Sequence, residues 1–241
     1  MFTTFVVAMG AFLGMTVQRC TGLGFAMTAV PIFTSVLGAY EGVLLANALS
    51  IPVTLSVLAA TWRNCEPMRA AALVTTSALA LLPGVALAKT VPQWALQLVG
   101  GGVILLSLAL MRMRPIAAAP SSRSGLAAVG LSSGLLNATV AMGGPPIAIY
   151  ANATGWSMER YVPTMQCTFL SMNLTALWLK GVPSVSASAL VSCVAAIAFG
   201  ALAGGYLSRN LRREILVRLA MIIATAGACS LIGKVAWDVV F

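Results

Sequence analysis

Long apolar runs separated by short polar segments follow one another along the whole chain. Six of these runs have the length of a membrane-spanning helix, which takes about 20 residues; they lie at 42–62, 70–88, 91–111, 161–179, 184–208 and 215–237. Two longer apolar stretches, 2–38 and 124–155, are each interrupted by a segment unsuited to a helix in lipid. The pattern predicts an all-α integral membrane protein in which each interrupted stretch forms a broken or re-entrant pair of helices.

The two interruptions indicate where a binding site would form. The first is Gln18–Gly24 and the second is Asn137–Pro146. Pro146 has no amide hydrogen and Pro145 restricts Gly144 away from the helical region, so the second segment cannot remain helical. Backbone groups freed at membrane depth must bond to protein or to water in a cavity. Broken helices at matching positions in two halves of a membrane protein are the best sequence indication of a transporter's binding site.

Residues at corresponding positions recur in the two halves of the chain. The ordered pairs are Gly10/Gly130, Gly14/Gly134, Gly24/Gly144, Glu41/Glu159, Trp62/Trp178 and Leu73/Leu190. Their spacing drifts only from 120 to 116 residues, which favours a duplication whose loops have diverged. We therefore predict a first membrane repeat at 1–112, a cytoplasmic linker at 113–123, and a second membrane repeat at 124–241. Each repeat is a broken pair followed by three transmembrane helices.

The basic residues predict that the two repeats have inverted topology. Loops 63–69 and 112–123 in the first half carry two and three arginines, and loop 209–218 in the second half carries four. The counterparts of loops 63–69 and 209–218, near Lys180 and Lys89, carry one charge each. Because cytoplasmic loops of membrane proteins are enriched in Lys and Arg, corresponding loops must lie on opposite sides. Both termini are then predicted to be periplasmic; whether the broken pairs are re-entrant or fully spanning is left open.

Composition agrees with a membrane protein and argues against several other classes. Hydrophobic residues make up 60% of the chain and charged residues 8%, whereas soluble domains carry about 25% charged residues. The net charge of +9 follows from basic loops between apolar runs, so we expect the bilayer and no nucleic acid as a partner. The five cysteines lie singly in the sequence, and we interpret them as packing residues.

The absence of several residue types limits the chemistry. The chain has no His, and none of its five acidic residues lies in the middle of a span, so no buried proton relay is indicated. Metal-ligand clusters, a nucleophile with a base, and a phosphate-binding Gly-Lys-Ser/Thr loop are also missing. We therefore expect no catalytic residue, no metal and no cofactor.

The first interruption offers one cation and several neutral hydrogen-bonding groups. Arg19 lies between two apolar runs, and an arginine at the bilayer centre costs about 2.5 to 3.5 kcal/mol unless it faces a cavity. A cation beside a freed helix N-terminus favours an anion; alternatively, Arg19 extends to an interface. The candidate substrate-binding residues here are Gln18, Arg19, Thr21, Gly22 and Gly24.

The second interruption and the following spans add neutral candidates. The position aligned with Arg19 is Thr139, which carries no charge. Capping of helix ends and hydrogen bonding between helices are the alternative explanations for these polar residues. The candidate substrate-binding residues are Asn137, Thr139, Gly143 and Gly144 at the interruption, with Asn47 and Gln166 inside spans. A small anion is the expected ligand.

Two motifs resemble those of a known family. Gly22-Leu-Gly-Phe25, followed by Pro31 and Ala46-Asn47, is similar to the first signature of the TauE/SafE sulfite exporter family, and Gly134–Pro146 is similar to its second. The resemblance implies a bacterial inner-membrane protein that moves sulfite, organosulfonates or related sulfur anions outward. The chain departs from the family pattern at Arg19-Cys-Thr21 and at Ala-Met before Gly143, which can shift substrate preference.

These observations lead to one hypothesis and two alternatives. The hypothesis is a secondary transporter that exports small sulfur oxyanions by alternating access between inverted repeats. The alternatives are an anion channel and a non-transporting membrane scaffold subunit whose breaks serve only packing. The exact anion, the coupling ion and the formation of a homodimer are left open.

Overall fold

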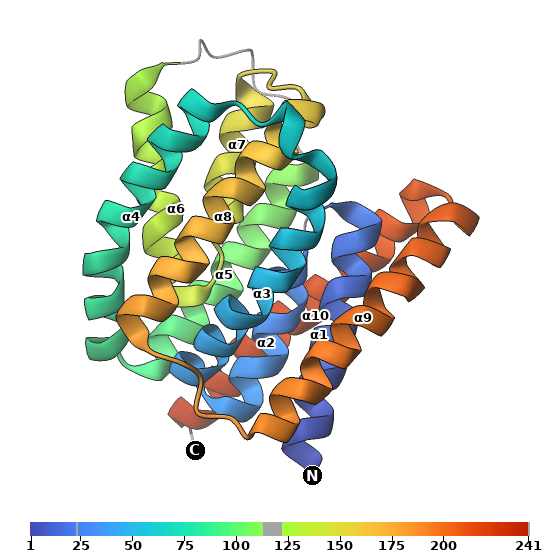
Figure 1. Cartoon of the computed structure of the whole chain (residues 1–241). Coiled ribbons are helices and arrows are strands. Elements are labelled where there is room, and N and C mark those ends of the chain that lie inside the picture. Colours follow the sequence, from blue (N-terminus) through green and yellow to red (C-terminus); the bar gives the residue numbers. More distant parts are fainter. Residues whose placement is uncertain (23, 113–121, 241) are drawn as a thin grey trace.

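The computed structural model describes residues 1–22, 24–112 and 122–240 of the chain, which fold into α-helices and one short 3-10 helix (Figure 1). The elements in order are α1 (Phe2–Thr21), α2 (Phe25–Leu37), α3 (Ala39–Thr61), η1 (Trp62–Asn64), α4 (Pro67–Thr90), α5 (Gln93–Arg112), α6 (Arg123–Val140), α7 (Gly144–Ala153), α8 (Met158–Lys180), α9 (Ala187–Asn210) and α10 (Arg213–Val240). Most of the predicted linker, 113–121, lies outside the described residues.

The apolar pattern predicted these helices correctly. The six predicted spans are α3, α4, α5, α8, α9 and α10, and the two interrupted stretches are the pairs α1–α2 and α6–α7. In the described part of the chain, α3 with η1, α4, α9 and most of α10 are long and apolar enough to cross a membrane. Local signals set several boundaries: Ser122 Oγ caps α6 by accepting from the amide of Gly125, and Ser186 Oγ caps α9. An all-α membrane protein is confirmed.

The first helix of each half packs along the fourth helix of the other half. Helix α1 lies along α9, and α6 lies along α4 (Figure 1). Glycines allow both approaches, because a Cβ at Gly200 would lie 2.6 Å from Phe12 O, and a Cβ at Gly134 would lie 2.2 Å from Ser77 O. Small residues commonly permit such close packing between membrane helices.

Helices α3 and α8 pack against each other at the centre of the molecule, and each begins beside the end of the other. Glu41 at the start of α3 accepts a 2.8 Å hydrogen bond from the amide of Ser184, which follows α8. Glu159 at the start of α8 accepts a 3.1 Å hydrogen bond from Asn64 Nδ2, which follows α3. The two helices are therefore antiparallel, and two carboxylates aligned in the sequence make reciprocal contacts.

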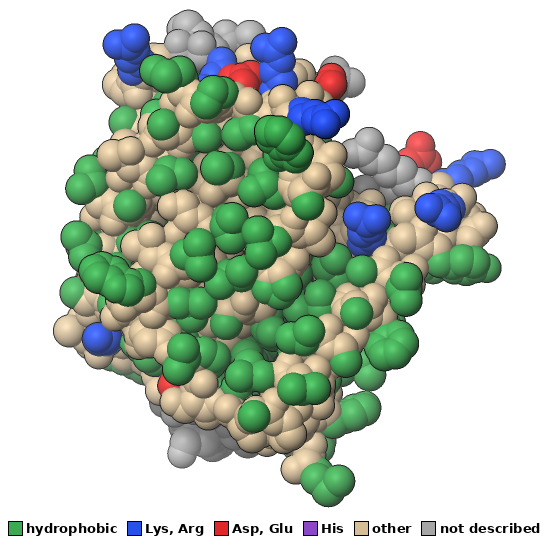
Figure 2. Space-filling view, in the orientation of Figure 1, with side chains coloured by type: hydrophobic (Ala, Val, Ile, Leu, Met, Phe, Trp, Pro, Cys, Tyr) green, Lys and Arg blue, Asp and Glu red, His purple; other side chains and the backbone are tan. Residues whose placement is uncertain are grey.

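The outer surface matches a bilayer environment. Apolar side chains cover the middle of the face in Figure 2, and Lys and Arg gather toward its upper end. Large apolar residues such as Leu79, Phe199 and Leu202 are exposed on the protein surface. Both chain termini lie at one end of the bundle, and α6 begins at the other (Figure 1).

Candidate functional site

The first break is closed by the side chain of Gln18. Helix α1 ends where Gly22 adopts a left-handed conformation with φ 80°, and α2 starts at Phe25. Gln18 Nε2 donates to Gly22 O at 3.1 Å, and Gln18 Oε1 accepts from Phe25 N at 3.1 Å. Gln18 thus satisfies backbone groups on both sides of the break, which lipid cannot do.

The second break is shorter than predicted: it comprises residues 141–143, and Pro145 and Pro146 lie inside the first turn of α7. Ala141 has φ 56°, and no other non-glycine residue in the described part of the chain has a positive φ. Its amide donates to Asn137 O at 3.0 Å. This conformation costs an L-residue other than glycine roughly 1–2 kcal/mol. Helix α7 then begins at Gly144, whose successors Pro145 and Pro146 suit the first turn of a helix. The second break therefore keeps local backbone strain, which is typical of functional sites.

A lysine from the end of α8 supports the second break. Lys180 Nζ donates to Ala138 O in the last turn of α6, where helical carbonyls have no partner of their own. The same ammonium lies over the ring of Tyr40, 5.4 Å from its centroid. Lys180 therefore stabilises the negative end of α6 from outside that helix.

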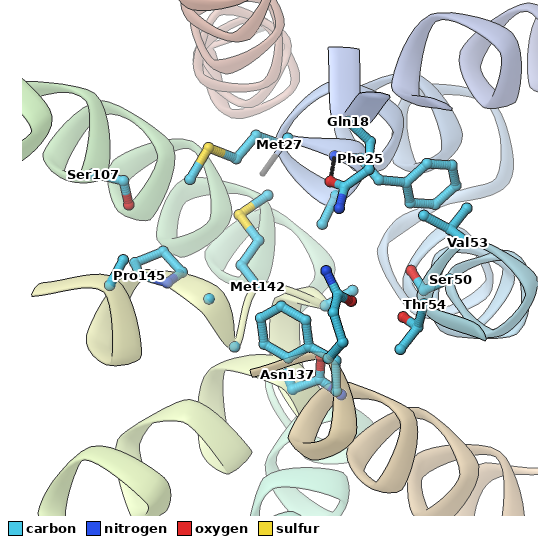
Figure 3. A pocket seen from close by; sticks show the side chains of 18 of the residues that line it. Gln18, Phe25, Met27, Ser50, Val53, Thr54, Ser107, Asn137, Met142 and Pro145 are labelled. Atoms are coloured by element: carbon cyan, nitrogen blue, oxygen red, sulfur yellow. Dashed lines mark hydrogen bonds between the residues drawn. The ribbon is translucent and has the colours of Figure 1, made fainter. Parts of the chain in front are cut away.

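Both breaks line one cavity of about 180 Å³ (Figure 3). Its walls come from α1, α2, α3, α5, α6, α7 and α8. The residues that line it are Gln18, Gly24, Phe25, Ala26, Met27, Ser50, Val53, Thr54, Ser107, Asn137, Ala141, Met142, Gly143, Gly144, Pro145, Ala148, Ile149, Asn152, Ala153, Gln166, Phe169 and Asn173. The cavity is smaller than the roughly 300–1,000 Å³ of sites for drug-sized molecules, so it suits a small ligand. None of these lining residues is Lys, Arg, Asp or Glu.

Polar and apolar side chains alternate around the cavity, with Val53 beside Ser50 and Ser107 on the side of Pro145. Figure 3 shows Ser50 and Thr54 opposite Met142 and Pro145. Asn137 Nδ2 approaches Asn173 Oδ1 at 3.5 Å, and Gln166 is 1% exposed with no hydrogen-bond partner for its Nε2. A buried amide without a partner is costly, so Gln166 is an unused donor at the cavity wall.

The N-termini of α2 and α7 also meet the cavity. Their N-cap residues, Gly24 and Gly143, line it. Gln18 already accepts from the Phe25 amide, and Pro145 and Pro146 have no amide hydrogen, so the attraction for an anion comes from the partial positive charge of the two helix ends. Electrostatic attraction at this site therefore comes from helix ends and amide groups.

The structure brings six of the predicted site residues to the cavity and leaves five outside it. Those in its wall are Gln18, Gly24, Asn137, Gly143, Gly144 and Gln166. Gly22 forms the left-handed end of α1. The hydroxyls of Thr21 and Thr139 donate to the carbonyls four residues earlier, at 2.8 Å each.

Arg19 and Asn47 complete the set outside the cavity. Arg19 is exposed, and its stem packs against α9, where a Cβ at Gly204 would lie 2.7 Å from Arg19 Cβ. This position agrees with the alternative that Arg19 extends to an interface. Asn47 is 1% exposed, and its Nδ2 has no hydrogen-bond partner.

Sequence reasoning missed several polar lining residues, although their spacing carried a signal. Ser50 and Thr54 follow Asn47 at i+3 and i+7, which places the three on one face of α3. Phe169 follows Gln166 at i+3 on α8, and Asn173, which the sequence already marks as a polar residue inside this span, follows at i+7. Ser107 and Asn152 also line the cavity, but nothing in their local sequence distinguishes them.

The family model described as "Sulfite exporter TauE/SafE" matches residues 6–231. The chain belongs to this family. The TauE/SafE match extends from α1 into α10 and includes both breaks, so the resemblance of the two motifs is confirmed. The family match and the apolar helices together identify the chain as a multi-pass membrane protein of a transporter family. TauE/SafE is not a family of enzymes. No curated protein and no solved structure matches the chain.

Proposed function

We propose that this protein exports a small sulfur oxyanion, sulfite or an organosulfonate, across the bacterial inner membrane through the cavity between the two breaks. The observation that carries the proposal is the meeting of two interrupted helices at one small cavity. Family membership supports the substrate class. The cavity supports a ligand that accepts hydrogen bonds and carries negative charge.

The anion would be held by neutral donors and helix ends. Gln166 Nε2 has no protein partner, so an oxygen of the substrate would satisfy it. The partial positive charges at the starts of α2 and α7 would face the same anion. Gln18 and Asn137 would position the breaks as well as line the site. Arg19, Thr21, Gly22, Thr139 and Asn47 would support the surrounding helices without touching substrate.

Reciprocal packing supports the inverted-repeat interpretation. Helices α1 and α9 correspond to α6 and α4 if the chain is duplicated, and both pairs are in contact. Glu41 at the start of α3 contacts the segment after α8, and Glu159 at the start of α8 contacts the segment after α3, so these contacts are reciprocal as well. Two repeats related in this manner would provide alternating access by rocking about the shared site. Both termini would then be periplasmic and the linker 113–123 cytoplasmic.

The cavity extends toward the end of the molecule predicted to be cytoplasmic. Its lining continues along α7 to Asn152 and Ala153. The turn after α7 contacts loop 63–69, because Trp156 Nε1 donates to Glu66 Oε1 at 3.3 Å. We interpret this conformation as one that receives the anion from the cytoplasm. Outward movement of one negative charge gains about 2.3 kcal/mol per 100 mV of negative-inside potential, so no coupling ion is required.

Flux into liposomes tests the proposal. Purified protein is reconstituted, and uptake of sulfite, sulfate, sulfoacetate and thiosulfate is measured with a fixed potential. Gln166→Leu should raise the half-saturating sulfite concentration by roughly tenfold or more, since a hydrogen bond to a charged group contributes about 1.5–3 kcal/mol. Gln97→Leu is the matched control, because Gln97 is also buried in a helix but does not line the cavity.

The outcomes separate the proposal from its alternatives. Absence of flux for every sulfur anion from correctly folded protein would contradict export and favour a scaffold role. Equal effects of Gln166→Leu and Gln97→Leu would contradict the assigned site. Single-channel currents carried by sulfite would contradict alternating access and favour an anion channel.

A further inference from the structure

A second pocket, of about 630 Å³, lies between the α3–α4 connection and the start of α8. Segment 63–69 forms most of its lining, and Glu159 and Arg160 of α8 complete it. None of these residues lines the cavity between the two breaks. Three of them are arginines, and the pocket lies at the end of the molecule where Lys and Arg gather (Figure 2). Its charge therefore attracts anions.

The two glutamates of this pocket are engaged by partners within the protein. Glu66 Oε2 lies 3.1 Å from Arg69 Nε, and Glu66 Oε1 accepts a 3.3 Å hydrogen bond from Trp156 Nε1. Glu159 accepts a 3.1 Å hydrogen bond from Asn64 Nδ2. The Arg69 guanidinium also lies over the Trp156 ring, 4.5 Å from its centroid. These contacts fix the shape of the pocket and use Arg69 as an internal counter-ion.

Arg63 and Arg160 keep their hydrogen-bond donors for a ligand. Arg160 Nη1 lies 3.7 Å from Glu66 Oε1, which is longer than a hydrogen bond, and its side chain is 67% exposed. Arg63 forms no ion pair within the described residues, and its guanidinium lies 5.7 Å from the centroid of the Trp62 ring. A guanidinium presents five N–H donors in a fork that matches the oxygens of a phosphate. Two such groups in one pocket favour an oxyanion of this geometry.

An exposed apolar strip leads along α3 and η1 to the pocket. Leu55, Ala59 and Trp62 follow one another at i, i+4 and i+7, which places them on one face, and all three are exposed. Trp62 ends this strip under the Arg63 guanidinium, and Met68, which lines the pocket, is 81% exposed. Because tryptophan is enriched at the interface between membrane and water, the pocket lies at the level of lipid headgroups. The strip below it suits an acyl chain.

We propose that this pocket binds the phosphate of an anionic phospholipid, with Arg63 and Arg160 donating to the phosphate oxygens and the strip Leu55–Trp62 contacting an acyl chain. Segment 63–69 is predicted to face the cytoplasm, so the lipid comes from the cytoplasmic leaflet. Basic pockets between membrane helices on that side bind the headgroups of anionic lipids. The bound lipid would bridge the α3–α4 connection of the first half and the start of α8 in the second half.

Lipid binding by the purified full-length protein tests the site. Delipidated protein in a neutral detergent is titrated with phosphatidylglycerol or phosphatidylcholine, and bound lipid is counted by native mass spectrometry. Phosphatidylglycerol should bind roughly tenfold or more tightly, because the choline cation of the other lipid cancels the phosphate charge. Arg63→Gln with Arg160→Gln should remove this preference, since two charge-assisted contacts are lost. The matched control is Arg209→Gln with Arg212→Gln, which removes the same charge from exposed positions outside the pocket.

Further variants and ligands separate lipid binding from other causes. Arg63→Lys with Arg160→Lys keeps both charges and should retain most of the preference, which distinguishes loss of charge from loss of fold. Inorganic phosphate and glycerol 3-phosphate, which lack acyl chains, should not raise the thermal midpoint at concentrations where phosphatidylglycerol does. Equal protection by either would overturn the lipid and assign the pocket to a free anion.

The binding assay also overturns the site directly. Equal losses of preference in the two Gln pairs, or no loss in either, would show that the pocket does not hold the headgroup. These measurements count bound lipid and need no transport, so a failed sulfite flux assay would contradict the proposed function and leave the lipid result intact.

Discussion

Gln18 of α1 and Phe25 of α2 are joined across the first break by a hydrogen bond of 3.1 Å, so one cavity-lining amide also fixes the start of the next helix. Gln18→Leu removes the acceptor for the Phe25 amide and the donor to Gly22 O. Leaving these buried groups unpaired should cost about 1–3 kcal/mol, measured as a lower thermal midpoint in detergent. Unchanged stability would mean that water satisfies both groups.

Gln18→Glu separates the structural role of this side chain from its role at the site. The carboxylate still accepts from Phe25 N but cannot donate to Gly22 O, and it places a negative charge in the cavity wall. Sulfite affinity should fall more than tenfold, because an uncompensated like charge near a binding site costs more than 1.4 kcal/mol. The comparison is liposome flux of Gln18→Glu against Gln18→Leu, and a higher affinity for the acidic variant would refute anion binding here.

Arg19→Ala should change sulfite flux by less than about twofold, because surface substitutions away from special features alter free energies by only about 0.5 kcal/mol. Its side chain is exposed and packs on α9, away from the cavity. The measurement is half-saturation and maximal flux in liposomes. A large loss of sulfite affinity in a variant that still folds would instead support binding of the anion by Arg19.

Ala141→Val should destabilise the protein by about 2 kcal/mol or more, because a β-branched residue with positive φ is a strained outlier. Ala141→Gly should be nearly neutral, since the relieved strain is offset by the greater backbone entropy of glycine in the unfolded chain. Ala128→Val is the control, because Ala128 is exposed on α6, the helix that ends just before Ala141. Thermal unfolding of the three variants is the measurement. Equal midpoints for Ala141→Val and Ala128→Val would argue against the left-handed conformation.

Gly134→Ala should separate α6 from α4. The added Cβ would lie 2.2 Å from Ser77 O, and overpacking of this kind typically costs about 1–3 kcal/mol. Gly102→Ala is the matched control, because nothing lies within 4 Å of a Cβ at that helical position. Thermal unfolding should rank the control as neutral or stabilising and Gly134→Ala as the less stable protein.

The apolar pattern was sufficient to predict the helices because each membrane span must satisfy its own backbone. Pro145, Pro146 and Gly24 likewise marked the breaks, since their effect is local. The sequence could not place Arg19, because the depth and direction of a long side chain depend on which helix packs beside it. The repeat boundaries and the periplasmic termini stay predictions.

A cavity wall built only from amides, hydroxyls, backbone and apolar groups contains nothing that titrates in the physiological range. No lining group named above would then exchange a proton with the cargo, and the pH dependence of transport would report the protonation of the cargo. A doubly charged anion leaving this site gains about twice the 2.3 kcal/mol per 100 mV that a singly charged one gains. Membrane voltage, acting on the charge of the bound species, would therefore select between the ionic forms of one substrate.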